Sequence, residues 1–390
     1  MNLSETKRIE SVDLLKGLVM VIMALDHTRD YFHWSSFFYD PTNPVQSTLP
    51  IFFTRWITHF CAPTFCFLAG LSAFLYGKKK SKSDLTHFLW KRGLWLVFIE
   101  LTIVNFAWYF DMQFRTPTMQ VIWSLGISMI FLSALIHLPK TGILIFSCVL
   151  IFGHNLLDSI HFPGNILWSI LHEFSGFSIT ENINGYIAYP IIPWVGVMSL
   201  GFWFGSFYDY SYDSSKRKKI FNSIGFSSLV LFVVLRLINN YGDPVPTEHY
   251  ASFSQTLIAF LNPTKYPPSL MYLLMTLGAS FLFLANSENL TGRIVNFFKT
   301  FGKVPFFYYV LHIYVIHILA MMLAEYSGFG WQSFILPSWV SETTYLKGYG
   351  VGLFTVYLIW IAVIALIYPL CKIFADYKMK NKEKNWLSYL

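Results

Sequence analysis

Long apolar stretches dominate this chain and leave it few ways to fold. About ten of them approach the roughly 20 mostly apolar residues that an α-helix needs to cross a bilayer. They are residues 10–29, 50–77, 93–112, 119–137, 141–157, 186–207, 219–238, 268–286, 303–325 and 349–374. The sequence therefore predicts an all-α, polytopic transmembrane helical bundle that forms a single domain over residues 1–390.

Composition supports a membrane protein and excludes several other classes. Hydrophobic residues make up 55% of the chain and charged residues 13%, whereas a soluble globular domain carries about 25% charged residues. The chain cannot cover itself with a wettable surface, which excludes a soluble enzyme, a coiled coil and a disordered protein. The expected location is an integral, multi-pass position in the membrane, in contact with lipid.

The distribution of basic residues predicts the orientation. With about ten spans and a cytoplasmic N-terminus, almost all of the 28 Lys and Arg residues fall in segments on the cytoplasmic side. The exceptions are Arg29, Arg55, Arg115, Arg236, Lys265 and Lys347. This imbalance follows the positive-inside rule and predicts that both termini are cytoplasmic. The net charge of +7 is thus interpreted as a topology signal and not as a nucleic-acid-binding surface.

The first predicted span carries ionisable residues on one face. Lys16 and His27 are eleven residues apart, which leaves them about 20° apart around a helix and about 16 Å apart along it. Asp13 precedes Lys16 by three residues and Asp30 follows His27 by three, so all four share a face. Ionisable groups in a span usually face a bundle interior or a wet cavity. The other interpretation places them at the helix ends, in contact with lipid headgroups.

His27 is the candidate catalytic residue of this face. A neutral imidazole near pH 7 can take a proton from an attacking hydroxyl or amine. Asp26 or Asp30 can orient the ring and stabilise its protonated form, and the spacing does not decide between them. The same stripe also suits a transporter or channel, which is the alternative function.

Several strings along the chain resemble one family. Ser11-Val12-Asp13, Lys16-Gly17 and Asp26-His27 resemble the start of the heparan-alpha-glucosaminide N-acetyltransferase-like membrane proteins. Lys16 and His27 also resemble the Arg/Lys-x10-His signature of the related membrane O-acyltransferases. Further strings similar to bacterial members lie at residues 55–77, 265–278, 301–320 and 386–390.

The resemblance implies a membrane acetyltransferase. The donor would be cytoplasmic acetyl-CoA, and the acceptor an amine or hydroxyl of a glycan or glycolipid on the outer side. The membrane would be the inner (cytoplasmic) membrane of a bacterium. His27 would act as general base or as acetyl carrier. In the lysosomal enzyme an asparagine matches His27 and the catalytic histidine lies further along, which makes His33 the second candidate here.

Donor-binding candidates lie near the cytoplasmic side. Lys91 and Arg92 begin the third predicted span, after a lysine-rich loop. Together with Lys16 they can hold the phosphates of coenzyme A, and arginine can do so with two hydrogen bonds. The same basic residues also serve as a topology signal, and that interpretation stays open.

Candidates for the acceptor side come from three segments. Arg55 and His59 are four residues apart on one face of the second span, and Lys265 belongs to the string Lys-Tyr-Pro-Pro. Tyr308 and His312 share a face of the ninth span. Each of these side chains can instead lie at the membrane interface or pack in the bundle.

No metal, nucleotide-hydrolysis or serine-hydrolase motif is found. The chain has no HExxH, no Cys/His zinc cluster, no Walker loop and no GxSxG elbow. The expected partners are membrane lipid and a glycan or glycolipid acceptor, with no nucleic acid and no metal. A homodimer is left open.

Overall fold

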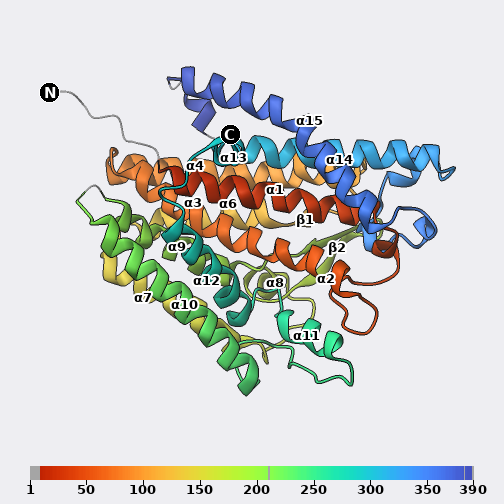
Figure 1. Ribbon diagram of the computed structural model, residues 1–390, viewed down its shortest axis with the longest axis horizontal. Coiled ribbons are helices and arrows are strands. Elements are labelled where there is room, and N and C mark those ends of the chain that lie inside the picture. Colours follow the sequence, from red (N-terminus) through yellow and green to blue (C-terminus); the bar gives the residue numbers. More distant parts are fainter. Residues whose placement is uncertain (1–8, 210, 382, 389–390) are drawn as a thin grey trace.

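The protein is described by a computed structural model that covers residues 9–209, 211–381 and 383–388 (Figure 1). It is mostly helical, as predicted. The helices in the first half of the chain are α1 Glu10–Phe32, α2 Leu49–Trp56, α3 Cys61–Gly77, α4 Lys82–Ile99, α5 Asn105–Tyr109, α6 Val121–Leu135, α7 Lys140–Gly153 and α8 Ile166–Leu171. The later helices are α9 Ile191–Phe204, α10 Ser214–Ile238, α11 Phe253–Leu261, α12 Leu270–Asn286, α13 Arg293–Lys303, α14 Pro305–Tyr326 and α15 Leu353–Lys380.

In the part of the chain that the structure describes, six helical segments are long and apolar enough to cross a membrane by length and composition. They are Leu49–Gly77, Lys140–Leu157, Ile191–Tyr208, Ser214–Ile238, Pro305–Tyr326 and Leu353–Lys380. Helices α6 and α12 are apolar but shorter, while α1 and α4 carry several charged residues. The helical membrane bundle is thus supported, and the count of about ten spans and the cytoplasmic termini stay predictions.

Helix α1 lies in the middle of the bundle. It packs against α3 on one side and against α13, α14 and α15 on the other (Figure 1). Helix α3 packs in turn on α9 and α12, and these contact α7 and α10 at the far edge. A charged face on α1 is therefore surrounded by protein and not by lipid, as expected for ionisable groups at membrane depth.

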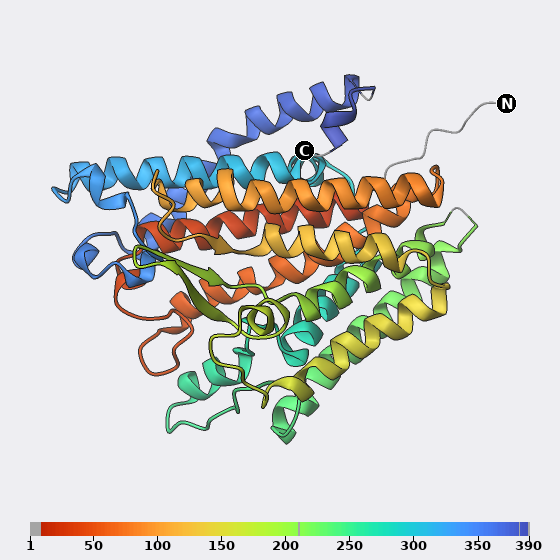
Figure 2. The same cartoon turned by 180° about the vertical axis from the view of Figure 1, so that it is seen from behind.

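A small sheet stands beside the helices, which the all-α prediction did not include. Strands β1 (Thr118–Met119), β3 (Ile183–Ile187) and β2 (Ser175–Thr180) form a three-stranded sheet in the order β1-β3-β2 (Figure 2). β1 pairs with β3 in parallel, and β2 pairs with β3 antiparallel. The side chain of Asn105 donates to the Thr118 carbonyl at 2.9 Å and accepts from its N–H at 3.0 Å. This contact fixes β1 to α5, and no helical periodicity could have revealed it.

Glycines set the closest helix contacts. A Cβ built on Gly201 of α9 would stand 2.0 Å from the Phe67 carbonyl oxygen of α3, and one on Gly70 would stand 1.9 Å from that of Met198. Such small residues let helix backbones approach closely in a membrane, where no hydrophobic effect drives helices together. The close packing of α3 on α9 therefore depends on glycine having no side chain at these two positions.

We expect Gly201→Ala to destabilise the protein, because the clash is with backbone and not with a movable side chain. Overpacking of this kind costs about 1–3 kcal/mol. The measurement is the midpoint of thermal unfolding of the purified protein in detergent. Gly153→Ala is the matched control, since nothing lies within 4 Å of a Cβ at that position. Equal midpoints for the two variants would contradict the expectation.

Candidate active site

A cavity of about 810 Å³ follows α1, within the range of about 300–1,000 Å³ typical of ligand pockets. Its wall includes Lys16 near the N-terminal end of α1 and Asp30 near the C-terminal end. The two positions are fourteen residues apart, which corresponds to about 21 Å along the helix. The cavity is therefore long enough for two ligands that enter from opposite ends of the bundle to meet inside it.

The Lys16 end of the cavity is basic. Arg92 of α4 also lines it, together with Ser72 and Tyr76 from the last turns of α3. The Lys16 ammonium donates to the Ser72 hydroxyl at 2.6 Å. Two cationic side chains from different helices thus meet in one part of the wall.

The other end is built around Asp26. Its two carboxylate oxygens are bound by different guanidinium groups: Arg29 donates to Oδ1 at 3.0 Å, and Arg55 pairs with Oδ2. Arg29 also donates to Asp30 at 2.6 Å. The side chains of Arg29 and Asp26 are only 2% and 8% exposed, so this network is shielded from solvent.

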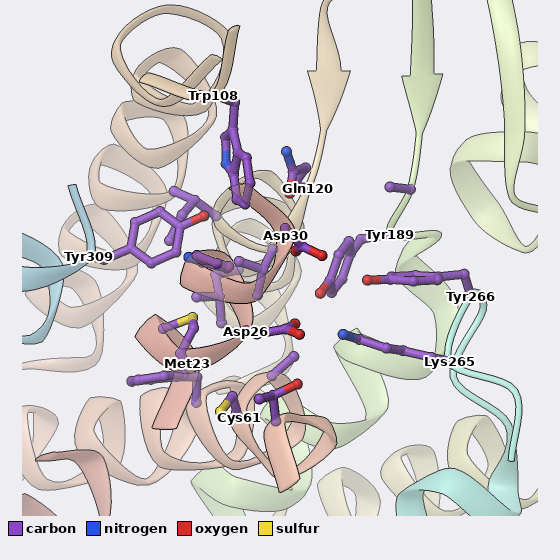
Figure 3. Close-up of a pocket in the computed structure, with 18 of the residues that line it drawn as sticks. Met23, Asp26, Asp30, Cys61, Trp108, Gln120, Tyr189, Lys265, Tyr266 and Tyr309 are labelled. Carbon is purple, nitrogen blue, oxygen red and sulfur yellow. The ribbon is translucent and has the colours of Figure 1, made fainter. Parts of the chain in front are cut away.

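Lys265 adds a third cation to this network. In Figure 3 its ammonium group and the Asp26 carboxylate point toward one another across the cavity. Burial raises the pKa of the neighbouring Tyr266 phenol, but the positive charges of Lys265 and Arg55 lower it by a larger amount. The pKa of Tyr266 therefore lies below its ordinary value. The carboxylates of Asp40 and Glu342 also line the cavity, so charges of both signs are present. Arg55 and Lys265 are the lining cations of this network that are available to an anion or a developing oxyanion.

His27 lies at the Asp26 end of the cavity, about 16 Å along α1 from Lys16, and is held by His312 of α14. His27 Nδ1 is 2.8 Å from His312 Nε2, and His312 Nδ1 is 2.9 Å from the Tyr308 carbonyl oxygen. A carbonyl only accepts, so His312 Nδ1 carries the hydrogen, and Nε2 of the neutral ring is an acceptor. His27 Nδ1 must then be the donor. This chain of bonds assigns an unprotonated Nε2 to His27, the form that can accept a proton.

The orienting contact thus differs from the one that the sequence suggested. Asp26 and Asp30 were the expected partners of His27, but both are engaged by arginines. Within the described ranges, no carboxylate is hydrogen-bonded to the His27 ring, whose polar partner is His312. Trp108 packs edge-on against the same ring, with the centroids 4.7 Å apart.

The structure brings many of the predicted site residues to one cavity. Those that line it are Lys16, Asp26, His27, Asp30, Arg55, Arg92 and Lys265. Tyr308 and His312 lie behind His27, and their rings stack on each other at 5.0 Å. His312 contacts His27 directly and Tyr308 contacts His312, so both residues are connected to the site through His27.

Three further predicted residues lie outside the lining. Lys91 is exposed, one position before Arg92. His59 is buried and its carbonyl accepts from the Tyr272 hydroxyl at 2.7 Å. His33 follows the last residue of α1, and its Nδ1 lies 2.7 Å from the Ser35 hydroxyl, in the turn that ends the helix. His33 is therefore placed as a turn residue, whereas His27 faces the cavity.

Sequence reasoning missed several lining side chains. Arg29 was considered only as a charge on the outer side, although it joins Asp26 to Asp30. Tyr266 was visible as the second letter of Lys-Tyr-Pro-Pro, next to Lys265. The sequence did not point to Trp108 or Gln120. Each follows an irregular segment of backbone, and the periodicity of apolar residues does not predict how such a segment orients the side chains after it.

Comparison with known proteins gives one family. The family described as heparan-alpha-glucosaminide N-acetyltransferase, catalytic, matches residues 8–236. That segment contains Lys16, His27, Arg55 and Arg92, whereas Lys265 and His312 lie beyond it. No curated protein matches the chain. The match covers more than half of the 390 residues and confirms the resemblance of the sequence strings, so the chain belongs to the heparan-alpha-glucosaminide N-acetyltransferase family.

Proposed function

We propose that the protein transfers the acetyl group of acetyl-CoA to an amine or hydroxyl of a glycan or glycolipid. The donor enters at the end lined by Lys16 and Arg92, and the acceptor at the end lined by Arg55 and Lys265. The observation that carries the proposal is that one cavity joins the basic end at Lys16 and Arg92 to the end that holds His27, Arg55 and Lys265. The family, whose name denotes an N-acetyltransferase, supports the reaction class.

His27 acts as general base in this proposal. The acceptor N–H or O–H gives its proton to His27 Nε2 while its lone pair attacks the thioester carbonyl carbon. The carbon–sulfur bond then breaks, and the CoA thiolate leaves and takes up the proton. Arg55 and Lys265 stabilise the intermediate oxyanion through the positive charges of their own side chains. In the second route, His27 Nε2 first accepts the acetyl group itself and then passes it to the acceptor.

The sidedness of the reaction follows from the predicted topology. With a cytoplasmic N-terminus, the Lys16 end of the cavity faces the cytoplasm, where acetyl-CoA is present. The acceptor then arrives from the outer side of the membrane, in a bacterium the outer side of the inner membrane. The reaction therefore needs both ends of the cavity to be reachable.

The purified full-length protein in lipid nanodiscs tests this proposal. We expect CoA release from acetyl-CoA that depends on an added amino sugar, with acetyl transfer to the sugar seen by mass spectrometry. Absence of turnover with every amine and hydroxyl sugar tried would overturn it. Solute flux in proteoliposomes without CoA release would instead support a transporter.

We expect Arg92→Gln to raise KM for acetyl-CoA by about 10- to 100-fold, since a hydrogen bond to a charged group is worth about 1.5–3 kcal/mol. The value of kcat should change much less, because Arg92 lies at the Lys16 end and distant from the acceptor end. Lys79→Gln is the control, as Lys79 is exposed and does not line the cavity. A KM that is equal in both variants would remove Arg92 from donor binding.

A further inference from the structure

A second cluster of polar side chains lies at the C-terminal end of α7, outside the cavity. His154 begins the single turn His154–Leu157 that ends this helix, Asp158 follows that turn, and His172 follows α8. One ligating atom from each of the three lies within 4.8 Å of the others. His154 and His172 are only 2% and 3% exposed, whereas Asp158 is partly exposed.

The histidines of this cluster have unsatisfied nitrogens. Within the part of the chain that the structure describes, neither ring nitrogen of His154 has a hydrogen-bond partner, nor has Nδ1 of His172. Buried polar atoms in proteins nearly always have partners, and an orphan points to a missing water or ion. Both histidines thus have an unpartnered nitrogen close to the Asp158 carboxylate, a combination that points to a cation.

We propose that His154, Asp158 and His172 bind a divalent transition-metal ion, with Zn²⁺ as the best fit. Imidazole and carboxylate are ligands that zinc uses, at about 2.0–2.2 Å, so that two ligand atoms lie at most about 4.4 Å apart. The observed spacing within 4.8 Å closes on an ion through small side-chain rotations. Three protein ligands leave a fourth tetrahedral position for water.

Neighbouring contacts already orient the carboxylate. His172 Nε2 lies 3.0 Å from Asp158 Oδ1, and Asn155 donates to Asp158 Oδ2 at 2.7 Å. Asn155 in turn accepts from the backbone N–H of Leu270, the first residue of α12. Hydrogen-bonded partners of this kind fix metal ligands in place. The site would therefore join the end of α7, the α8 loop and the start of α12.

This position connects the metal to the cavity. His172 is followed two residues later by Phe174, which lines the cavity near the acceptor end. A metal that holds His172 would fix the segment leading into β2 and thus one part of the wall. The cluster had no signature in the sequence, because its spacing His-x3-Asp-x13-His is not one of the common zinc patterns.

Metal analysis of the full-length protein tests the proposal. The protein is purified without a polyhistidine tag, stripped with a chelator, loaded with ZnCl₂ and passed through gel filtration. We expect about one Zn²⁺ per chain in the wild type and in His249→Asn, a control with an exposed loop histidine. Asp158→Asn and His172→Gln should bind Zn²⁺ at least ~10-fold more weakly.

Thermal unfolding supplies a second measurement that does not depend on enzyme activity. Zn²⁺ should raise the unfolding midpoint of the wild type and of His249→Asn, but not that of Asp158→Asn. If a variant fails to fold, the zinc content and the unfolding midpoint of the wild type still decide the question. The proposal is overturned if the loaded wild type retains no zinc, or if both ligand variants retain as much as the wild type, which would indicate adsorption only.

Discussion

Replacing His27 by glutamine is expected to lower kcat for acetyl transfer about 10²- to 10⁴-fold, the usual contribution of a general base. Glutamine can still donate an amide hydrogen to His312 Nε2, but it has no nitrogen that accepts a proton. The cavity wall should therefore keep its shape, and KM for acetyl-CoA should change little. Initial rates of CoA release at saturating acetyl-CoA measure the effect.

The control for this prediction is His87→Gln. His87 is an exposed histidine of α4 whose Nδ1 lies 2.8 Å from the Ser83 carbonyl oxygen of its own helix, and it does not line the cavity, so its loss should leave kcat unchanged. A His27→Gln variant with the activity of His87→Gln would remove His27 as base and carrier. His312→Ala should lower kcat by a smaller factor at constant KM, because it frees His27 to adopt the unproductive tautomer.

Removal of the Asp26 carboxylate is expected to give the largest loss of stability. Asp26→Ala removes the partner that the buried Arg29 and the partly buried Arg55 share, and breaking a buried ion pair in this way costs about 3–5 kcal/mol. The midpoint of thermal unfolding in detergent measures the change. Asp209→Ala is the control: Asp209 is 43% exposed and pairs with Lys78, so its loss should cost about 0–1 kcal/mol.

A second substitution separates the buried charge from a general packing defect. If the uncompensated guanidinium causes the loss, Asp26→Ala combined with Arg55→Met should be more stable than Asp26→Ala alone, because methionine fills similar space without charge. A double variant that is less stable than the single one would show that Arg55 is held by contacts other than Asp26.

The polar face of α1 was predictable from the sequence because helix periodicity is local. Lys16 and His27 were expected on one face, and both line the cavity. The apolar runs likewise predicted a helical membrane bundle. Asp13 was expected on the same face and is buried, yet it does not line the cavity, since α13 packs closely against that turn. Periodicity predicts the direction in which a side chain points around its helix, but not whether a cavity or another helix lies in that direction.

The partners of this face were decided by tertiary packing. His312 lies 285 residues from His27, and Lys265 reaches Asp26 from the loop before α12. The proton-accepting form of His27 depends on the Tyr308 carbonyl, through a ring on another helix. The residue pattern of a single helix determines which of its side chains share a face, whereas contacts between helices depend on their register and crossing, which arise only when the whole bundle packs.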